Sequence, residues 1–282
     1  MSAEAPARRS TLSVATIAYN EEANLARTLE SVRWADELVV VDSGSRDRTV
    51  AIAESFGAKV FVHTPFAGHG EQKNITLDHC NSDWILLLDA DEVITPELAA
   101  SIKQVLALGE KAPFRAYWIA RSNLIFGRWM RHGGFYPDHK LRLFRRGEAR
   151  LSEGVGPHST PQFTGPRGKL TGDMLHYAYP SLHLYLEHMD RYSTEVGSLI
   201  AAKGKLSRSP LAFLSNIVLN PVATFVYNYI FRGGFLDGRE GLLLHLYHSV
   251  YVSWKYAKAW EDGRRQSANA SRISRTKEKP VA

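Results

Sequence analysis

Cysteine is nearly absent from this 282-residue sequence, in which Cys80 is the single one. A single thiol excludes a scaffold held by internal disulfides and favours a reducing compartment. Residues 1–10 have no apolar stretch of the kind that a secretory signal peptide carries. Because 44% of the residues are hydrophobic and 23% are charged, a disordered or collagen-like chain is excluded as well. These features predict a folded protein of the cytoplasm.

Glycine-rich phosphate-binding loops are also missing. The turn after the first predicted strand is AYNEEAN (18–24), which lacks the glycines that let the backbone of a dinucleotide-binding enzyme approach a pyrophosphate. No Gly-x-x-x-x-Gly-Lys-Ser/Thr occurs, which argues against a P-loop NTPase. The glycine-rich, arginine-containing loop of sugar-1-phosphate nucleotidyltransferases is absent too.

The net charge of +6 is unevenly distributed. Residues 1–100 carry 8 basic and 16 acidic side chains, residues 115–150 carry 9 and 2, and residues 263–282 carry 6 and 1. Because the basic residues fall in two blocks and the first third is acidic, the pattern does not indicate a nucleic-acid partner. It favours a metal site in the first third, with phosphate and anionic lipid near the basic blocks.

Apolar runs and helical spacing alternate along the first third of the chain. Short apolar or β-rich runs predict strands at 12–18, 37–42, 59–63 and 84–89. Amphipathic or capped stretches predict helices at 23–32, 48–56 and 72–79, and another that begins at Thr95 and Pro96. This alternation predicts an α/β fold with a Rossmann-like, mostly parallel sheet.

Polar residues follow these strands at their carboxyl ends, where such sheets bind ligands. Tyr19 to Glu21 follow the first strand, Asp42 ends the second, and Asp89-Ala90-Asp91 closes the fourth. Two carboxylates one residue apart at a strand end can hold one divalent cation, and hard oxygen ligands favour Mg²⁺ or Mn²⁺. Asp-x-Asp alone is common in solvated turns, so the prediction depends on the convergence of the strand ends.

Several segments carry a family resemblance. AYNEE, VVVDSGSRDRT, GHGEQKN and DWILLLDADE, in this order, resemble the nucleotide-sugar-binding half of family 2 glycosyltransferases with the GT-A fold. HGGFYPDHKLRLFRRGEARL (132–151), GDMLHYAY (172–179), GFLDG and YVSWKYAKAWE are similar to a narrower subgroup, the bacterial lipopolysaccharide-core β-1,4-glucosyltransferases and their relatives. The resemblance therefore covers most of the chain.

The resemblance implies a UDP-sugar donor, a divalent cation and a set of site residues. Those implied to contact the nucleotide sugar are Ala18, Tyr19, Glu21, Asp42, Lys73, Asp89, Gly133 and Gly134, with Asp42 at the uracil ring and the two glycines near the donor sugar. Asp89, Asp91 and His176 are implied to hold Mg²⁺ or Mn²⁺. From the residues alone, a packed core Tyr19, a solvated Lys73 and a structural His176 stay open.

The catalytic base is less defined than the other site residues. Inverting transfer needs a carboxylate that takes the proton of the acceptor hydroxyl. The resemblance implies a carboxylate after His158, where the sequence has Ser159. The candidate bases are Glu153, which we prefer, and Asp138, with an ordinary surface charge as the alternative for each.

Basic residues of the middle block are candidates for the acceptor site. Lys140 and Arg142 could bind a phosphate group of the acceptor. Strand alternation places them on one face with Phe144, and places Leu141, Leu143 and Arg145 on the other.

The C-terminal third differs in composition. Helices are predicted at 181–203 and, with many aromatic residues, at 242–260. No charge occurs between Arg208 and Arg232; this stretch is long enough to span a bilayer, but three asparagines and Pro221 favour an interfacial or packed helix. Tyrosine, tryptophan and lysine side chains in the later helix favour docking on a membrane surface, and a packing module for the catalytic domain is the alternative.

These observations define one prediction of organisation and function. We expect a flexible N-terminus at 1–10, a GT-A domain at 11–180, a helical membrane-associating region at 181–262 and a basic disordered tail at 263–282. The expected activity is inverting transfer of a hexose, glucose from UDP-glucose, to a lipid-linked saccharide, the lipopolysaccharide inner core, at the anionic inner-membrane surface. The alternatives are a transferase acting on polyprenyl phosphate or another glycolipid, and an inactive transferase-like membrane scaffold.

Overall fold

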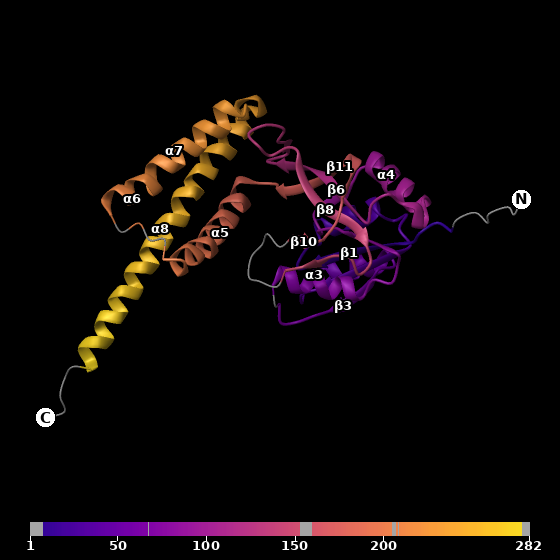
Figure 1. Ribbon diagram of the computed structural model, residues 1–282, viewed down its shortest axis with the longest axis horizontal. Coiled ribbons are helices and arrows are strands. Elements are labelled where there is room, and N and C mark those ends of the chain that lie inside the picture. The colour runs from indigo at the N-terminus through magenta and orange to yellow at the C-terminus, as the bar shows by residue number, and fades with distance from the viewer. Residues whose placement is uncertain (1–7, 67, 153–159, 205–206, 208, 278–282) are drawn as a thin grey trace, which may run out of the picture. The chain divides into compact units, whose positions relative to one another are not determined.

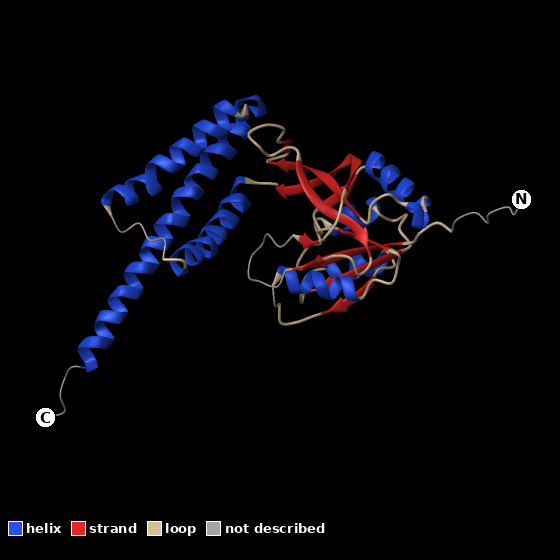
Figure 2. Cartoon of the chain, in the orientation of Figure 1, coloured by secondary structure: helices blue, strands red, loops and turns tan. Residues whose placement is uncertain are grey.

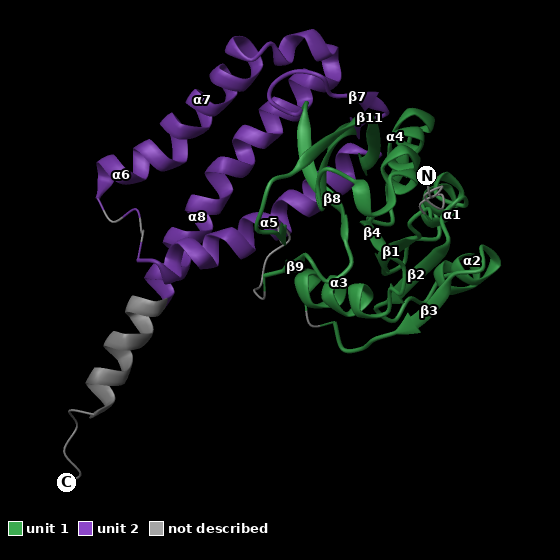
Figure 3. Ribbon diagram, turned by 45° about the vertical axis from the view of Figure 1, so that its right-hand side comes forward, with its two compact units in different colours: residues 1–123, 136–178 green, residues 124–135, 179–282 purple. Residues whose placement is uncertain are grey.

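The chain folds into two compact units, drawn in separate colours in Figure 3. The computed structural model describes residues 8–66, 68–152, 160–204, 207 and 209–277, with side chains as far as Arg265. Unit 1 comprises residues 1–123 and 136–178, and unit 2 comprises residues 124–135 and 179–282. The division near residue 178 lies close to the domain boundary expected at 180, but the segment 124–135 packs with the second unit.

Unit 1 is built around a mixed sheet (Figure 1). Its strands among the described residues are β1 (Leu12–Ala18), β2 (Glu37–Asp42), β3 (Lys59–Val62), β4 (Trp84–Leu87), β5 (Glu92–Ile94), β6 (Ala116–Ile125), β8 (Asp138–Arg145) and β11 (Gly168–Tyr179), in the order β3-β2-β1-β4-β8-β6-β11-β5, and the short β7 (Arg128–Trp129) pairs with β6. β3, β2, β1 and β4 pair in parallel. β8 is antiparallel to β4 and to β6, and β11 is antiparallel to β5. The expected parallel arrangement therefore holds for the first four strands, and an antiparallel half follows.

Helices cover both faces of this sheet (Figure 2). They are α1 (Leu25–Ser31), α2 (Thr49–Ser55), α3 (His69–Asp78), α4 (Pro96–Ala107) and the 3₁₀ turn η1 (Gly109–Lys111). Leu25 and Leu29 of α1 and Ile102 of α4 pack in the core on one face, and Leu77 of α3 packs in the core on the other. Burial on both faces explains the continuous apolar runs of β2 and β4.

Local signals in the sequence account for several element ends. Thr95 accepts a hydrogen bond from the backbone N–H of Leu98 and Pro96 stands in the first turn of α4, as the sequence predicts. Asp47 accepts from the backbone N–H of Thr49, the first residue of α2, although Arg48 is the N-cap residue of this helix. A separate short ribbon pairs β9 (Arg150–Leu151) with β10 (Pro161–Gln162).

Unit 2 is mainly helical. It contains α5 (Leu182–Ala202), a helix from Pro210 to Phe231 that comprises α6 (Pro210–Leu214), η2 (Ser215–Leu219), α7 (Asn220–Phe225) and η3 (Val226–Phe231), the turn η4 (Gly234–Asp237), and α8 (Gly238–Lys277). Ser181 caps α5 by accepting from the backbone N–H of Leu184. Much of the 210–231 helix and all of α5 lie alongside α8.

One expectation about unit 2 is wrong in part. We predicted a disordered tail from Gly263, but the backbone of α8 continues as helix through Lys277. The sequence after Gly263 contains alanine, arginine, lysine and glutamine, which have good helix propensity, and no proline before Pro280. High charge was therefore an insufficient reason to predict disorder over residues 263–277.

Candidate functional site

The first polar turn lies at the carboxyl end of β1. Tyr19 leaves 56% of its surface exposed, which excludes the packed-core alternative, while Ala18 is buried at the strand end. Glu21 is half-buried and accepts a hydrogen bond from Asn24 at 2.9 Å. Burial raises the pKa of Glu21, and the nearby carboxylates of Asp91, Asp47 and Asp89 raise it further. The side chain of Glu21 therefore lies within the electrostatic range of the Asp-x-Asp segment.

Asp42 closes the turn after β2. Its Oδ2 accepts hydrogen bonds from the backbone N–H groups of Gly44 and Ser45, each at 2.8 Å, and its Oδ1 accepts from the Ser45 hydroxyl at 2.5 Å. Gly44 has φ +91°, a left-handed conformation that suits glycine. Asp42 is thus a buried carboxylate that fixes the loop between β2 and α2.

Asp89 lies between two cations that come from distant parts of unit 1. Lys73 Nζ of α3 lies 2.6 Å from its Oδ1, and Arg142 Nη2 of β8 lies 2.5 Å from its Oδ2. Burial alone would raise the pKa of Asp89, but Arg142 and Lys73 hold it well below its ordinary value. Lys73 is itself buried, which excludes the solvated alternative.

Behind Asp89 lies Glu92, a fully buried carboxylate for which we predicted no role. Its Oε2 accepts from the backbone N–H of Asp89 at 3.0 Å, and its Oε1 lies 2.7 Å from Arg142 Nη2 and 3.3 Å from Arg121 Nη1. The sequence signal for Glu92 was its place inside DADEVI, where a charged residue enters an otherwise apolar strand. Glu92 joins the Asp89 site to the antiparallel half of the sheet.

The network continues across β6 and β8. Arg121 Nη2 lies 2.7 Å from Asp138 Oδ2, and Lys140 Nζ lies 3.0 Å from Asp138 Oδ1. Burial would raise the pKa of Asp138, but Arg121 and Lys140 lower it. Both oxygens of this candidate base are therefore engaged with cations.

Arg142 reaches Asp89 and Glu92 from an irregular position in β8. Leu141 is the partner of Trp118 and Leu143 is the partner of Tyr117, so Arg142 is an extra residue, a β-bulge. The bulge reverses the alternation that we expected after it. Leu143 packs in the core cluster of Tyr117, and Phe144 packs in that of Leu141, so the predicted grouping of Leu141 with Leu143 on one face is wrong.

A second pair lies beside this network. His176 Nε2 of β11 is 3.2 Å from Asp91 Oδ2, and its Nδ1 is 2.7 Å from the Asn123 side-chain oxygen. Because the Asn123 side-chain oxygen can only accept, Nδ1 of His176 donates in this bond, and its Nε2 faces Asp91. Tyr177 follows His176 in the sequence, and the guanidinium carbon of Arg27 stacks 3.5 Å from the centroid of its ring. His176 and Asp91, 85 positions apart in the sequence, thus face each other.

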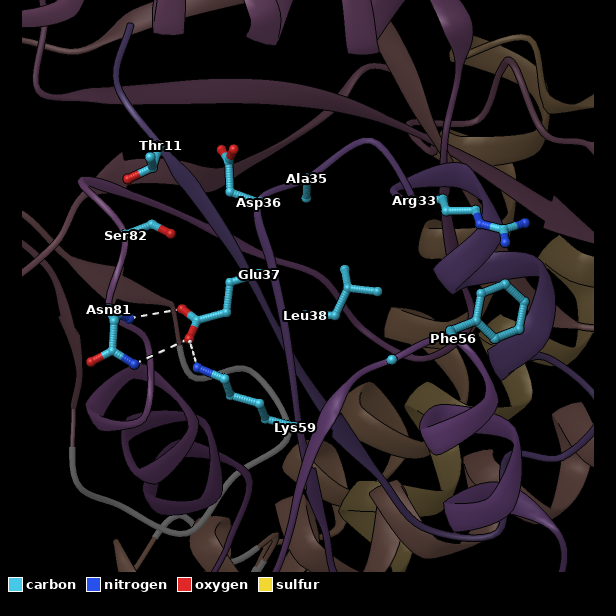
Figure 4. A pocket seen from close by; sticks show the side chains of 11 residues that line it. Thr11, Arg33, Ala35, Asp36, Glu37, Leu38, Phe56, Lys59, Asn81 and Ser82 are labelled. Atoms are coloured by element: carbon cyan, nitrogen blue, oxygen red, sulfur yellow. Dashed lines mark hydrogen bonds and ion pairs between the residues drawn. The ribbon is translucent and has the colours of Figure 1, made fainter. Parts of the chain in front are cut away.

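A hollow of about 420 Å³ occupies the opposite end of the parallel strands (Figure 4). Its polar lining residues bond one another: Glu37 accepts from Lys59 Nζ at 2.7 Å and from the Asn81 backbone N–H at 2.8 Å. It lies at the amino ends of β1, β2 and β3, away from the carboxylates described above. We assign it no role in the site.

Comparison with known proteins places the sequence in a family. The family model described as Glycosyl transferase family 2 matches residues 13–168. This chain belongs to glycosyl transferase family 2. The lipopolysaccharide core biosynthesis glycosyltransferase LpsC of Rhizobium meliloti is 28% identical over 89% of this chain and 92% of its own length. An uncharacterized glycosyltransferase of Rickettsia typhi is 31% identical over 69% of each chain.

Among solved structures, S. aureus TarS 1–349 in complex with UDP is 17% identical, with a TM-score of 0.47 over 91% of this chain and 92% of that one. The described residues of this family 2 glycosyltransferase form the α/β fold that the sequence predicted, and a helical C-terminal region follows in the chain.

Among the described residues, the predicted metal ligands Asp91 and His176 lie next to each other. No group of three or more His, Cys, Asp or Glu side chains gathers closely enough within them to hold a cation alone. Asp91 and His176 are two adjacent ligand groups, and both Asp89 oxygens already contact cations. Since Mg²⁺ sites often use one or two protein carboxylates and leave positions for substrate phosphates, Asp91 and His176 fit such an open site.

Three predicted site residues stay predictions: Glu153, Gly133 and Gly134. Glu153, His158 and Ser159 fall outside the described residues, so Glu153 stays a prediction. Gly133 and Gly134 lie in unit 2, with φ +66° and +89°, and pack against His245 and Arg232. Their approach to a donor sugar also stays a prediction.

Proposed function

We propose that this glycosyltransferase transfers a hexose, glucose from UDP-glucose, with inversion to a lipid-linked saccharide of the lipopolysaccharide inner core. The observation that carries the proposal is the Asp-x-Asp segment after β4, where Asp89 pairs with Lys73 and Arg142 and Asp91 pairs with His176. The likeness to LpsC along nearly its whole length supports the acceptor class.

Each residue near Asp89 has a definable task in this proposal. Asp91 and His176 would hold Mg²⁺ or Mn²⁺, which when bound neutralises negative charge on the diphosphate of the donor. Lys73 and Arg142 keep Asp89 ionised and in one orientation at the nucleotide. Tyr19 presents an exposed ring, which suits stacking on the uracil or ribose of a UDP-sugar.

The proton acceptor of the reaction is a separate question. Asp138 is a poor candidate because Arg121 and Lys140 lower its pKa, and a base with a lowered pKa holds a proton weakly. Glu153 therefore stays our preferred base. It would take the proton of the acceptor hydroxyl while the oxygen attacks the anomeric carbon and the nucleoside diphosphate departs.

The lipid-linked acceptor agrees with the surface of unit 2. The helix Pro210–Phe231 is long and apolar enough to cross a membrane by length and composition, and only 6% of its most apolar stretch is buried. Asn216 bonds Ser207 and Asn220 bonds Asn216, so these amides are satisfied within the protein. We propose that this helix lies in the interface of the anionic inner membrane, at its cytoplasmic face, rather than crossing it.

Ligand-induced thermal stabilisation tests the metal and nucleotide part. UDP with Mn²⁺ should raise the melting temperature of the wild-type protein, and Asp91→Asn should remove most of that increase because the cation loses a carboxylate ligand. Asp78→Asn is the matched control, since Asp78 pairs with Arg150 on the surface. An unchanged increase in Asp91→Asn would show that Asp91 holds no cation.

A donor screen tests the reaction itself. Purified protein, core-truncated lipopolysaccharide and a panel of UDP-sugars are incubated with Mn²⁺, and the product mass is measured. A mass gain of one hexose from UDP-glucose is expected. A mass gain on polyprenyl phosphate and none on lipopolysaccharide would show that the proposed acceptor is wrong. No mass gain with any donor would favour the inactive scaffold.

A further inference from the structure

Two loops of unit 1 leave neighbouring strands at the same level. β1 ends at Ala18 and β2 ends at Asp42, and these two residues are paired in the sheet. The next residue of the second loop, Ser43, donates its backbone N–H to the Ala18 carbonyl at 2.9 Å. The β1 turn (19–22) and the β2 loop (43–49) therefore start side by side at the carboxyl ends of the parallel strands.

Asn20 and Ser45 make the central contacts between the two loops. The backbone N–H of Asn20 donates to the Ser45 hydroxyl oxygen at 2.8 Å, and the Asn20 side-chain oxygen accepts from the backbone N–H of Arg46 at 2.9 Å. The Ser45 hydroxyl donates in turn to Asp42 Oδ1 at 2.5 Å. This loop clasp (Asn20, Ser45 and Asp42) thus runs from the β1 turn to the buried carboxylate that ends β2.

The rest of the β1 turn is fastened to the β2 loop in the same way. The backbone N–H of Glu21 donates to Thr49 Oγ1 at 2.7 Å, and that of Glu22 donates to Asp47 Oδ2 at 3.1 Å. The Glu22 carboxylate accepts from the backbone N–H of Arg48 at 3.2 Å. Consecutive backbone donors of the turn therefore end on side chains of the β2 loop, which limits the positions that the turn can take relative to that loop.

Asn20 has a backbone conformation that few residue types adopt. Its φ is +53°, in the left-handed region, which asparagine and aspartate tolerate better than other residues with a Cβ. Glycine would adopt this conformation more easily, but it has no side-chain oxygen to accept from Arg46. Asparagine therefore satisfies both the turn and the loop clasp.

The loop clasp joins the two residues that the proposed function places against the uracil and ribose. Tyr19, with its exposed ring, immediately precedes Asn20, and Asp42 is the other end of the clasp. Asn20 itself is exposed, so its hydrogen bonds compete with water and add little to the stability of the fold. An exposed residue in a strained conformation is better explained by a ligand that the loops prepare for.

The β1 turn also lies close to the Asp-x-Asp segment of the same unit. Burial raises the pKa of Glu21, and the nearby carboxylates of Asp91 and Asp89 raise it further. The turn leads into α1, in which Thr28 Oγ1 donates to the Ala90 carbonyl at 2.7 Å. The loop clasp and the groups assigned to the diphosphate therefore lie along one edge of one sheet.

We propose that Asn20 and Ser45 are positioning residues for the donor nucleotide, which hold the β1 turn and the β2 loop in one arrangement before UDP binds. The inference rests on the proposed function, in which Tyr19 and Asp42 contact the nucleoside. A preformed pair of loops binds UDP more tightly, because no cost of ordering the loops is subtracted from the contacts. The effect concerns the affinity for the nucleotide, whereas the chemical step takes place at the sugar.

Calorimetric titration of the full-length protein with UDP and Mn²⁺ tests Asn20 through a graded series. Asn20→Ala loses the side-chain oxygen and disfavours the left-handed φ, so it should raise the Kd of UDP by about tenfold or more. Asn20→Gly loses only the oxygen and should raise Kd by about three- to fivefold. Asn20→Asp keeps an acceptor and tolerates the φ, so its Kd should stay within about twofold of the wild type. Equal losses in all three variants would contradict the role of the clasp.

Ser45→Ala tests the other member of the clasp. It removes the hydroxyl that accepts from Asn20 and donates to Asp42, and it should raise the Kd of UDP by about five- to tenfold. Ser45→Thr keeps the hydroxyl and should recover most of the affinity. Wild-type affinity in Ser45→Ala would show that Ser45 has no positioning role.

Asn81→Ala is the matched control. The Asn81 side-chain amide also joins two segments of unit 1, by donating to Glu37 Oε1 at 3.1 Å, but it lies at the amino ends of the parallel strands. The variant should lower the melting temperature and leave the Kd of UDP unchanged. A clasp that only stabilised the fold would behave in the same way, so a lower melting temperature with unchanged Kd in Asn20→Ala would refute the inference.

Two further measurements separate positioning from folding. In steady-state kinetics, Asn20→Ala should raise the KM for UDP-glucose and leave kcat within about twofold, since the nucleoside is remote from the reacting bond. In hydrogen exchange, the Arg46 amide should exchange faster in Asn20→Gly than in the wild type, because it loses its acceptor. Unchanged exchange at Arg46 would show that the clasp does not hold the loop.

The failure of this inference differs from the failure of the proposed function. If the wild type binds no UDP with Mn²⁺, the proposed function is wrong and the role of the clasp fails with it. If the wild type binds UDP and Asn20→Ala binds it equally well, only the inference is wrong. If Asn20→Ala fails to fold, Asn20→Gly decides, because glycine accepts the backbone conformation of the turn.

Discussion

Individual carboxylates of unit 1 behave differently because their neighbours differ. Asp89 and Asp138 each face two cations, Asp91 faces an imidazole, and Glu21 faces an amide and other carboxylates. The pKa of Glu21 is therefore raised while the pKa values of Asp89 and Asp138 are lowered. Residue type alone did not indicate these differences, since all four are acidic residues near strand ends.

Glu37 provides a pH-dependent contribution at the residue scale. Burial would raise its pKa, but hydrogen bonds from Asn81, Lys59 and Ser13 lower it from 4.5 to about 2. A carboxyl group whose pKa is lowered by folding stabilises the folded state at pH values above its ordinary pKa. This contribution is lost as the pH falls from 4.5 toward 2.

Glu37→Gln should therefore reduce the free energy of unfolding by about 1–2 kcal/mol at pH 7. This loss is smaller than the full pKa shift would give, because Lys59 is largely exposed and solvent screens its charge. Urea denaturation at pH 7 and pH 3 measures the difference between wild type and variant, which should shrink at the lower pH. A difference of equal size at both pH values would contradict the prediction.

At the scale of elements, the bulge in β8 decides the geometry of the site. A regular strand would alternate strictly, whereas the extra residue lets Arg142 face Asp89 and Glu92 while Leu143 stays in the core. No glycine or proline marks this position in LRLFRR, so periodicity alone could not reveal it. The pairing of β8 with β6 determines it.

Removing the Arg142 side chain should destabilise the folded state, because the carboxylates that pair with it stay in place. Arg142→Ala leaves the buried carboxylate of Glu92 without its closest cation and should lower the free energy of unfolding by about 3–5 kcal/mol. Lys140→Ala is the matched control on the same strand and should cost less than about 1 kcal/mol, because Lys140 is partly exposed. Equal losses in urea denaturation would mean that Glu92 does not depend on Arg142.

At the scale of the whole molecule, unit 2 exposes a large apolar surface. Along the helix 210–231, the residues with high exposure recur at helical spacing: Leu211, Leu214, Val218, Leu219, Val222, Tyr227, Ile230 and Phe231. Phe235 and Leu236 follow in the next turn, and Arg232 and Arg239 are exposed beside them. An apolar face with flanking cations and aromatic residues is typical of proteins that dock on anionic membranes.

Vesicle flotation tests this surface in the full-length protein. Leu211→Asp combined with Phe231→Asp should weaken binding to vesicles that contain anionic lipid by about tenfold or more, since these side chains are 80% and 76% exposed and would lose apolar contact with lipid. Leu108→Asp is the control, an exposed apolar residue of unit 1. If both proteins floated as the wild type does, another surface would have to carry the binding.

The sequence predicted much of unit 1 because its signals are local. The strands 12–18 and 37–42 have the predicted bounds, and the long helix after Ser181 was expected as well. Asp91 and His176 were grouped from a family resemblance, and the structure brings them within 3.2 Å. Glu92 was missed because its neutralisation depends on Arg142 and Arg121, two residues that only strand pairing brings near.

The sequence by itself determined the α/β alternation, the polar strand ends and the apolar helix of unit 2, because periodicity and turn chemistry act over a few residues. Tertiary structure alone decided which cations face Asp89, where β8 bulges, and that the 131–135 loop packs with α8. These depend on contacts between segments far apart in the chain, and such contacts leave no periodic trace in the sequence. The helical continuation of α8 beyond Gly263 adds that a charged composition does not exclude regular structure.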